Sequence, residues 1–311
     1  MKAPKKGLGR VGVLAGGPSN ERDISLRSGK AVHDALIGEG VDAVLLDVGS
    51  DIRNMIKREP IDVAFIALHG RFGEDGTVQN ILESLGMPYT GSGVEASRLA
   101  LDKIAAKQVF TDSMIPVPRH EVVSKTRYDA DKISRLGLPV AVKPQFEGSS
   151  IGLSVVREKD ALEAAIDKAL EYDDNALVEE YIDGRELTVG ILEDKALPVI
   201  EIVTKGKIYD YSAKYSDPET KYLVPAPISD AQSLKAQELG VRAHTALGCR
   251  CFSRIDMMMD SSGALFVLEA NTIPGMTERS LLPKAAGAKG LNFGALCIIL
   301  VKDALQRRKQ R

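Results

Sequence analysis

The sequence lacks tryptophan altogether, and only 5% of its 311 residues are aromatic. Proteins that bind single-stranded nucleic acid stack the bases on aromatic side chains, so the composition disfavours this class. The formal net charge of −2 also argues against the basic footprint of a general nucleic-acid binder. We therefore expect no nucleic-acid partner.

Cysteine is scarce as well, with only Cys249, Cys251 and Cys297 in the chain. An odd number of cysteines, two of them one residue apart, does not make a disulfide framework. The pair Cys249 and Cys251 has no second pair and no nearby histidine at zinc spacing. We interpret all three as small hydrophobic residues in a reducing compartment.

Long apolar runs are missing too. The basic residues 1–10 precede an apolar stretch that stops at Gly16, which is too short for the core of a signal peptide. The run ALCIILV near the other end cannot span a bilayer. We predict a cytoplasmic protein without a membrane partner.

The chain is 44% hydrophobic and 27% charged, which is typical of a globular protein, and it is long enough for two or three domains. Residues 10–100 alternate short apolar runs with helical patterns, and this alternation predicts parallel βαβ units. Residues 87–93 are interpreted as a short strand and turn. Ligands usually bind at the carboxyl ends of such strands.

Residues 100–183 predict a small α+β module that begins with one helix over residues 100–113. Longer strands follow from residue 185, then a helix over 230–247 and a strand pair over 252–269. The fold class predicted is α/β, with α+β character in the central module. The predicted domains are residues 1–98, 99–183 and 184–311.

Residues 139–152 read PVAVKPQFEGSSIG and contain the GxSxG pattern of a serine nucleophile elbow. An elbow needs a helix after it, but residues 153–156 are β-like. The one downstream histidine, His244, lies in a helical pattern. We therefore reject a serine hydrolase.

Two glycine patterns also fail as dinucleotide fingerprints. GLGRVG at 7–12 precedes its strand instead of following it. GSGVEA at 91–96 has alanine in place of the third glycine and lacks the acidic residue expected further on. Nicotinamide-dinucleotide binding is disfavoured.

A phosphate cradle fits the turn at 148–152 better. Its glycines and two serines, Ser149 and Ser150, expose backbone N–H groups and hydroxyls without bulk, which suits phosphate oxygens. Lys143, on the strand that leads in, supplies a cation. The P-loop pattern GxxxxGK[ST] is absent, so this is no P-loop NTPase. A plain polar hairpin remains the alternative for this stretch.

Residues 253–271, SRIDMMMDSSGALFVLEAN, predict a hairpin. Closing a four-residue loop pairs residue 256 with 267 and residue 254 with 269, which puts Asp256, Glu269, Asn271 and Arg254 on one face. The residues assigned to the opposite, core face are Ile255, Met257, Phe266 and Leu268.

Two carboxylates and an amide, with no histidine or cysteine nearby, favour Mg²⁺ over Zn²⁺. Two ions bridged by Glu269 would clamp a transferring phosphoryl group. The alternative is a cross-strand ion pair between Arg254 and Glu269 on a solvated face.

Residues 176–186, ALVEEYIDGRE, form an apolar strand that ends in glutamates and turns at Gly184. The backbone here, with Glu179 nearby, could pair with the amino edge of adenine, and Glu186 could hold ribose hydroxyls. A surface turn with ordinary charges is the alternative.

Taken together, these motifs resemble the D-alanine–D-alanine ligases of the ATP-grasp superfamily, from about residue 10 to residue 300. The motifs that carry the resemblance are, in order, GGPSNERDISLRSG, ALHGRFGEDGTVQ, PYTGSG, LALDK, VKPQFEGSSIGLS, VEEYIDGRELTV, YDYSAKY, RIDMMMD and LEANTIPGMTERSLLP.

The resemblance implies an ATP-grasp fold, which holds ATP between two α+β domains, and two Mg²⁺ ions that Mn²⁺ can replace. Asp256, Glu269 and Asn271 match the magnesium site of the family. The residues that match its ATP site are Lys103, Lys143, Ser150, Glu179, Tyr181 and Ile182 through their backbone, Glu186 and Lys214.

The resemblance also implies substrate and catalytic residues. Glu21 resembles the carboxylate that receives the ammonium of the first D-alanine, with His69 close by, and Ser149 links this site to the flexible loop. The remaining matches are Arg254 and Gly275 for the oxyanion, Ser280 and Leu281 for the carboxylate of the second D-alanine, and Tyr215, beside Lys214, in the ω-loop lid.

The implied reaction begins when ATP phosphorylates the first D-alanine. The amine of the second then attacks the acylphosphate. Tyr215 favours D-alanine as the second substrate, so the implied product is D-alanyl-D-alanine for peptidoglycan. A ligase that uses D-lactate or D-serine instead is the alternative, and a nucleotide-binding protein without turnover is disfavoured by the complete set of site residues. The family implies a homodimer.

Overall fold

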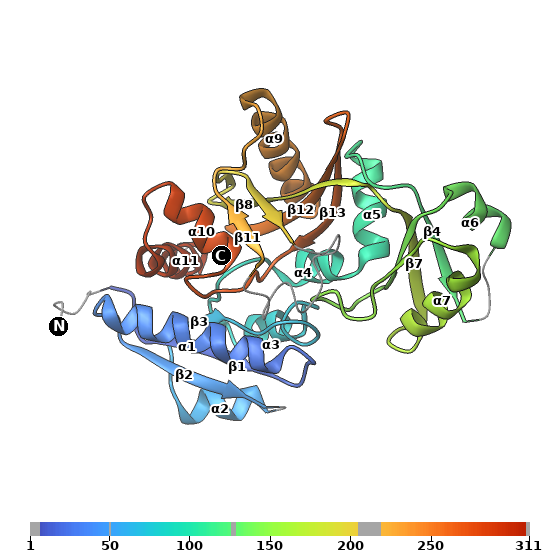
Figure 1. Ribbon diagram of the computed structural model, residues 1–311. Helices are drawn as coiled ribbons and strands as arrows, with labels where there is room; N and C mark the ends of the chain where they lie inside the picture. The colour runs from blue at the N-terminus through green and yellow to red at the C-terminus, as the bar shows by residue number, and fades with distance from the viewer. Residues whose placement is uncertain (1–6, 50, 126–128, 205–218, 309–311) are drawn as a thin grey trace.

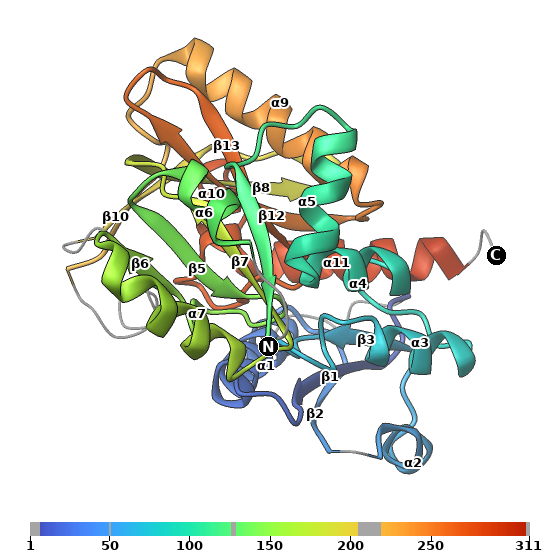
Figure 2. The ribbon, with the colours of Figure 1, turned by 90° about the vertical axis from the view of Figure 1, so that its right-hand side faces the viewer.

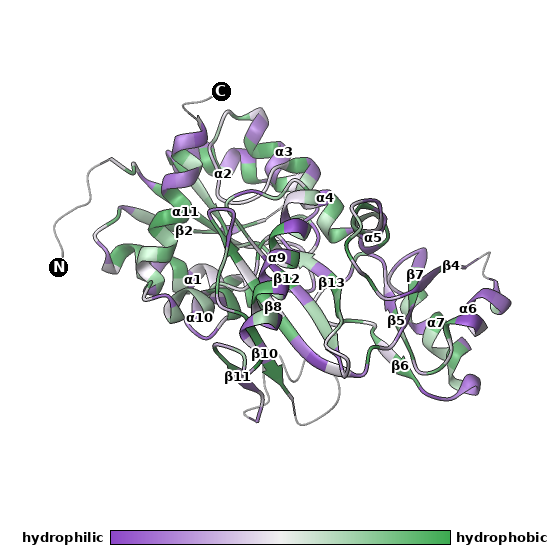
Figure 3. Ribbon diagram, turned by 90° about the horizontal axis from the view of Figure 1, so that it is seen from above, coloured by the Kyte–Doolittle hydropathy of each residue, from purple (hydrophilic) through white to green (hydrophobic). Residues whose placement is uncertain are grey.

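The structure of the protein is a computed structural model that describes residues 7–49, 51–125, 129–204 and 219–308. Its strands form three sheets, each from a different part of the chain, and helices pack on all of them (Figure 1). Most helices carry alternating hydrophobic and hydrophilic bands in Figure 3, as expected when one helix face is buried. The predicted α/β class with a parallel N-terminal sheet is confirmed, and the later sheets are antiparallel.

The N-terminal sheet is parallel and has the strand order β2-β1-β3. Strand β1 is buried along its whole length because helices cover both faces of the sheet. Residues 87–93, predicted as a strand and turn, instead contribute an isolated bridge between Tyr89 and Ala64. The elements are β1 (Val11–Gly16), α1 (Arg22–Gly38), β2 (Ala43–Val48), α2 (Ile52–Arg58), β3 (Val63–Ile66), α3 (Thr77–Ser84) and α4 (Val94–Leu101).

The central sheet is antiparallel, in the order β4-β7-β5-β6, and lies nearest the viewer in Figure 2. Helices α6 and α7 cover one face, where Val140 and Val142 of β5 are buried. Strand alternation turns Lys143 to the other face. The elements are α5 (Lys103–Asp112), β4 (His120–Ser124), α6 (Ala130–Leu136), β5 (Val140–Pro144), β6 (Ser154–Val156), the 3₁₀ turn η1 (Lys159–Ala161), α7 (Leu162–Leu170) and β7 (Asn175–Glu180).

The C-terminal sheet has the order β11-β10-β8-β12-β13, with β9 paired to β8. Helices α9 and α5 pack on one face, while the other face is covered in part by α10 and in part lines a cavity toward the central sheet. The elements are β8 (Gly184–Leu192), β9 (Lys195–Ala196), β10 (Ile200–Val203), β11 (Lys221–Leu223), α9 (Asp230–Ala246), β12 (Phe252–Asp260), β13 (Leu265–Asn271), α10 (Leu281–Ala288) and α11 (Phe293–Arg308).

The predicted register of the β12–β13 hairpin is wrong by two residues at Asp256, which lies opposite Glu269 and not opposite Val267. The turn is one residue longer than predicted, so that Met259 pairs with Leu265, and a β-bulge between Val267 and Glu269 adds the second residue. The longer turn and the bulge also change which residues of β13 are in the core. Leu265, Val267 and Ala270 are buried there, whereas Phe266 and Leu268 are only partly buried.

The single helix predicted over residues 100–113 is two helices. Asp102 has an extended backbone (ψ 97°) and ends α4, and its side chain accepts hydrogen bonds from the backbone N–H groups of Ile104 and Ala105 at the start of α5. An aspartate is a strong N-cap, and the helical periodicity on either side conceals the break. The new helix starts at Lys103, so the cap fixes where this lysine points.

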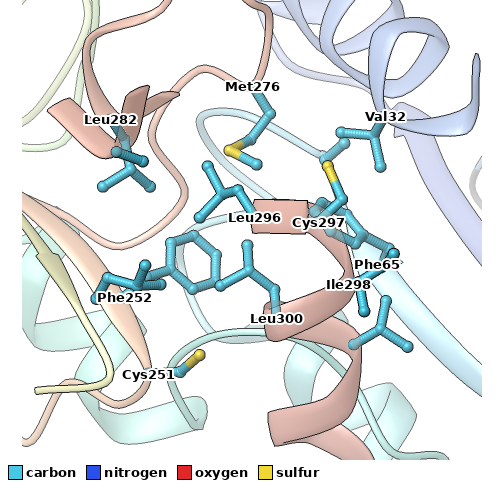
Figure 4. Packing of buried hydrophobic residues seen from close by; sticks show 14 of the residues in the cluster. Val32, Phe65, Cys251, Phe252, Met276, Leu282, Leu296, Cys297, Ile298 and Leu300 are labelled. Carbon is cyan, nitrogen blue, oxygen red and sulfur yellow. The ribbon is translucent and has the colours of Figure 1, made fainter. Parts of the chain in front are cut away.

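The N-terminal and C-terminal parts of the chain share one hydrophobic core (Figure 4). Val32 of α1 and Phe65 of β3 pack against Leu296 and Leu300 of α11, with Phe252 of β12 in the same cluster. Helix α5 likewise packs on the C-terminal sheet. Each sheet lies within one of the three predicted domains, but the domain boundaries themselves stay a prediction.

The three cysteines are free and buried, as predicted. Burial raises the pKa of Cys249 to about 11 and that of Cys297 to about 12, so both are inert thiols. His244 lies on α9 with its ring nitrogens near Ser253 Oγ (2.7 Å) and Asp194 Oδ1 (3.1 Å), remote from the GxSxG turn.

Over the described ranges, no single helix combines the length and apolar composition needed to cross a membrane. Helices α10 and α11 would meet both conditions only as a pair, and that pair is bent by 104°.

Candidate active site

Two adjoining cavities lie where the three sheets approach one another. The larger has a volume of about 320 Å³ and takes its walls from all three parts of the chain. The smaller, of about 150 Å³, lies between the central and C-terminal sheets. Lys103 and Glu269 line both cavities, so these two side chains mark the junction.

The predicted site residues within the described ranges all line one or both cavities. Those of the larger cavity are Glu21, His69, Lys103, Ser149, Arg254, Glu269, Asn271, Gly275, Ser280 and Leu281. Those of the smaller cavity are Lys103, Lys143, Ser150, Glu179, Tyr181, Ile182, Glu186, Asp256 and Glu269. The predicted lid residues Lys214 and Tyr215 lie outside the described residues.

Glu21 stands at the start of α1, where the chain leaves the carboxyl end of β1. Its side chain is buried, and the hydroxyl of Ser149 donates a short hydrogen bond to it from the glycine-rich turn. A buried carboxylate with one neutral donor keeps lone pairs for a cationic ligand. The turn also approaches closely, because a Cβ at Gly148 would lie 2.9 Å from Glu21 Oε2.

His69 follows the carboxyl end of β3 and is also buried. Its Nε2 lies 3.2 Å from Ser28 Oγ, and its Nδ1 lies 3.6 Å from Glu74 Oε1. Burial raises the pKa of Glu74, with the charge of Glu21 adding to the effect and His69 opposing it. Our sequence reasoning missed Glu74, although the spacing within HGRFGED already puts a carboxylate in the same loop as the histidine.

Ser280 and Leu281 stand at the start of α10, on the far wall of the larger cavity. The Ser280 hydroxyl accepts a hydrogen bond from the Thr277 N–H (3.1 Å) and contacts Thr277 Oγ1 (2.9 Å), which holds the turn before the helix. The first N–H groups of a helix have no partner within it and carry the positive end of its dipole. This wall therefore favours an anion.

Asp256 and Glu269 face each other across the hairpin, and Asn271 lies opposite Arg254. The alternative ion pair of Arg254 with Glu269 is not formed. Arg254 instead donates to both oxygens of Asp256 (2.8 and 2.6 Å). Thr188 of β8 adds a third donor to Asp256 at 2.6 Å, a partner that only the sheet order reveals.

The donor set of this hairpin fits a magnesium ion. It offers two carboxylates and one amide, which are the hard oxygen ligands that Mg²⁺ accepts. No cluster of three histidine, cysteine, aspartate or glutamate side chains suited to a metal occurs within the described ranges. A zinc-type site is thus not found there, and a site with few protein ligands leaves positions for oxygens of a bound ligand.

The smaller cavity contains a buried chain of charges. Glu179 on β7 accepts Lys143 Nζ at 2.5 Å and Lys107 Nζ at 2.6 Å. Burial alone raises the pKa of Glu179, but the two lysines outweigh it and hold the pKa below its usual range. Burial lowers the pKa of Lys107. Our sequence reasoning missed Lys107, although it lies four residues after Lys103 and so shares its helix face.

The adenine-side residues lie at the end of β7. The Tyr181 N–H donates to Pro139 O (3.0 Å), so this donor is already engaged. Arg157 lies over the Tyr181 ring at 5.5 Å from its centroid. Met258, turned from the core by strand alternation, and Leu268, at the bulge, line the cavity as apolar walls.

The chain between β5 and β6 forms a tight turn, as the cradle hypothesis requires. Ser149 and Ser150 both have left-handed backbone angles (φ 50° and 60°), and Gly152 follows with φ 73°. Two consecutive non-glycine residues in this region are uncommon and costly. The Lys103 ammonium donates to the Glu147 carbonyl at 2.5 Å, which joins the start of α5 to this turn.

The chain matches known proteins over nearly its whole length. The family model described as the D-ala D-ala ligase C-terminus matches residues 108–302, and the one described as the D-ala D-ala ligase N-terminus matches residues 48–92. The D-alanine–D-alanine ligase of Citrifermentans bemidjiense is 48% identical over 295 residues, which is 95% of this chain and 96% of the relative. That of Ectopseudomonas mendocina is 46% identical over 303 residues, 97% of each.

A solved structure agrees with the sequence comparison. The D-alanine–D-alanine ligase of Bacillus anthracis complexed with ATP superimposes with a TM-score of 0.87 at 32% identity, covering 97% of this chain and 99% of that one. Sequence and fold agree across the N-terminal, central and C-terminal parts. The chain belongs to the D-alanine–D-alanine ligase family.

Proposed function

We propose that this protein joins two D-alanine molecules with ATP, forming D-alanyl-D-alanine, ADP and phosphate for peptidoglycan precursor synthesis. One observation carries the proposal: the two cavities adjoin at Lys103 and Glu269. The smaller cavity has cationic side chains and oxygen ligands suited to magnesium, and the larger has one anionic and one cationic wall. An amino acid bound in the larger cavity would present its carboxylate to a phosphate bound in the smaller. The relatives named above carry this activity in their names.

ATP is proposed to bind in the smaller cavity. Its phosphates would meet the ammonium groups of Lys103 and Lys143 and the turn with Ser150. Adenine would lie near Glu179 and the backbone of Tyr181 and Ile182, against the apolar side chains of the cavity. The residue proposed for the ribose is Glu186.

Asp256, Glu269 and Asn271 are proposed to hold two Mg²⁺ ions, which Mn²⁺ could replace. When bound, such ions neutralise charge on the phosphates of ATP. The residues of the chain would fix the position of this centre. Thr188 and Arg254 hold the Asp256 carboxylate by three hydrogen bonds, so it is oriented before any ligand arrives.

The first D-alanine is proposed to bind with its ammonium at Glu21 and with His69 beside it. Its carboxylate would then point to the junction of the two cavities, where the γ-phosphoryl group is transferred. Arg254 and the Gly275 N–H would stabilise the negative charge that develops on the reacting carbonyl oxygen. The chain contributes mainly positioning and charge stabilisation.

The second D-alanine is proposed to place its carboxylate at Ser280 and the Leu281 N–H. Its amine would attack the acylphosphate, and the tetrahedral intermediate would collapse with loss of phosphate. D-Lactate or D-serine as acceptor is the competing specificity, and Tyr215, the residue on which our preference for D-alanine rests, lies outside the described residues. Exclusion of water from the cavities would protect the acylphosphate.

The experiment that tests the proposal measures ADP release with MgATP and D-alanine, and identifies the products by mass with D-lactate and D-serine supplied as competitors. D-alanine-dependent ADP with mainly D-alanyl-D-alanine is the expected result. Mainly mixed product would overturn the acceptor specificity. ATP binding without D-alanine-dependent ADP would leave a nucleotide-binding protein and overturn the ligase.

The proposal includes a cytoplasmic homodimer with domains at residues 1–98, 99–183 and 184–311. The cytoplasm is proposed because the ligase would require ATP and amino acids that are present there. Sedimentation of the purified protein tests the dimer, and limited proteolysis tests the boundaries near residues 98 and 183.

A further inference from the structure

The turn over residues 145–152, which we name the phosphate loop, is anchored at its start within the central part of the chain. Gln145 accepts a hydrogen bond from the Asn175 amide (3.0 Å) and donates one to Asp102 (2.9 Å). The strained residues Ser149 and Ser150 come later, beyond this anchor. A strained segment persists only if surrounding contacts hold it. The middle of the loop therefore needs partners from outside.

Lys103 of α5 holds the Glu147 carbonyl, and further partners come from the N-terminal part of the chain. Glu21 accepts from Ser149, and the Asn20 amide lies 3.5 Å from a Glu147 oxygen. The third partner is Arg71, two residues after His69, which lies beyond the carboxyl end of β3. No sequence motif in our reading gave Arg71 a role.

Arg71 contacts the loop and its support in three ways. Its guanidinium pairs closely with Asp173, a carboxylate whose side chain is only 4% exposed. Its Nε lies 3.5 Å from Glu147 Oε1. Its Cζ lies 5.5 Å from the centroid of the Phe146 ring, at cation–π distance. One side chain thus touches two successive loop residues and the buried carboxylate behind them.

Asp173 strengthens the case that this contact acts on the loop. Its other oxygen accepts a hydrogen bond from the Phe146 N–H at 2.8 Å. The guanidinium and the loop backbone are therefore held by the two oxygens of one buried carboxylate. A charge-assisted pair of this kind, with one partner desolvated, exceeds the value of an ordinary surface pair.

We propose that Arg71 is a positioning residue that acts as a latch and holds the phosphate loop closed over both cavities. Closure of this loop over the nucleotide is then coupled to the loop that carries His69. The inference rests on the proposed function for its catalytic consequence. With the latch removed, the loop opens more often and water reaches the acylphosphate. Phosphate is then released without dipeptide, because hydrolysis competes with attack by the second amine.

The test compares the wild-type protein with Arg71→Ala and Arg71→Lys. The matched control is Arg10→Ala, since Arg10 also pairs with carboxylates (Glu59 at 3.3 Å, Asp42 at 3.9 Å) but lies far from the loop in the N-terminal part. Two quantities are measured: backbone hydrogen exchange over residues 145–152, and phosphate released per dipeptide formed.

In Arg71→Ala we expect exchange over residues 145–152 to rise about tenfold, with exchange in β1 and β3 unchanged. Phosphate per dipeptide should rise above one, and kcat should fall about tenfold while KM for ATP changes less. Arg71→Lys should give smaller changes than Arg71→Ala in both the exchange and the phosphate-to-dipeptide ratio, because lysine keeps the positive charge but lacks the planar guanidinium. Arg10→Ala should match the wild type.

Phe146→Leu provides a second, milder arm, because it removes the ring and keeps both ion pairs. We expect about a threefold rise in exchange over the same residues. Wild-type exchange and a ratio of one in Arg71→Ala would overturn the latch. If the wild type itself forms no dipeptide, the proposed function fails instead, and the exchange measurement still decides whether Arg71 holds the loop.

Discussion

The two cavities are built in different ways. The smaller takes much of its wall from regular strands, β5, β7 and β12, whose opposite faces lie in the hydrophobic cores. The larger also has strand residues in its wall but adds residues just beyond strand ends and at helix starts, such as Glu21, His69 and Ser280. Strand alternation fixes the first geometry locally. The second depends on how the three parts of the chain are assembled.

Their electrostatics differ accordingly. In the smaller cavity the Glu179 carboxylate forms ion pairs with Lys107 and Lys143, so its charge is balanced before a ligand binds. In the larger, Glu21 has a neutral serine donor and faces the start of a helix across the space. We conclude that the smaller cavity is preorganised, while the larger relies on the ligand to complete its charge pairing.

The largest effect should come from Glu269→Gln, at the junction of the two cavities. The change removes a carboxylate from the proposed magnesium ligands and from the surroundings of Lys103. We expect kcat to fall on the order of 10³-fold. D-alanine-dependent ADP release at saturating ATP measures it, with the exposed Glu163→Gln as control. Near wild-type turnover with an unchanged magnesium requirement would show that the junction is not the reaction centre.

Lys107→Met should destabilise the protein by disrupting the paired charges of the smaller cavity. It leaves Glu179 buried with one lysine, and loss of one partner from a buried pair costs about 3 kcal/mol of unfolding free energy. Urea denaturation measures the loss, with the exposed Lys168→Met as control. The double variant Lys107→Met with Glu179→Gln should recover part of it. Equal stability of Lys107→Met and wild type would mean that Lys143 alone balances the carboxylate.

Glu21→Gln should affect the larger cavity alone. Losing the charged partner of an ammonium should raise KM for D-alanine by about tenfold to a hundredfold. Calorimetry with a non-hydrolysable ATP analogue should give an affinity within about twofold of wild type, because Glu21 does not line the smaller cavity. Asp23→Asn, exposed on the same helix, is the control. A parallel loss of nucleotide affinity would show that Ser149 couples the cavities.

The smallest effect concerns His244, outside both cavities. Burial lowers its pKa below the ordinary 6.5, with Asp194 partly opposing the shift. The unfolded chain therefore binds a proton more readily, so stability is full above pH 6.5 and falls as the pH drops below it. Urea denaturation at pH 7.5 and 5.5 should show the loss, and His244→Gln should reduce it. If the stability difference between pH 7.5 and pH 5.5 were the same in His244→Gln as in the wild type, the pH dependence would come from other groups.

The contrast between the cavities also explains what could be predicted from the sequence. The hairpin pattern placed Asp256, Glu269 and Asn271 on one face, since strand periodicity is local. The same reasoning misassigned Phe266 and Leu268, because the turn is one residue longer than assumed and a bulge leaves no mark in an apolar run. Lys107 and Arg71 were missed because their partners, Glu179 and Asp173, lie on other elements far along the chain.

By itself the sequence determined the parallel N-terminal part, the α+β character of the central part, the glycine-serine turn, and the oxygen donors of the hairpin, because each depends on neighbours a few residues apart. Only the tertiary structure decided that Arg254 pairs with Asp256, that Lys107 neutralises Glu179, and that Arg71 reaches the phosphate loop. The last two are contacts between side chains on separate elements, whereas Arg254 and Asp256 are two residues apart on β12. Burial and charge select them only once the three sheets have come together.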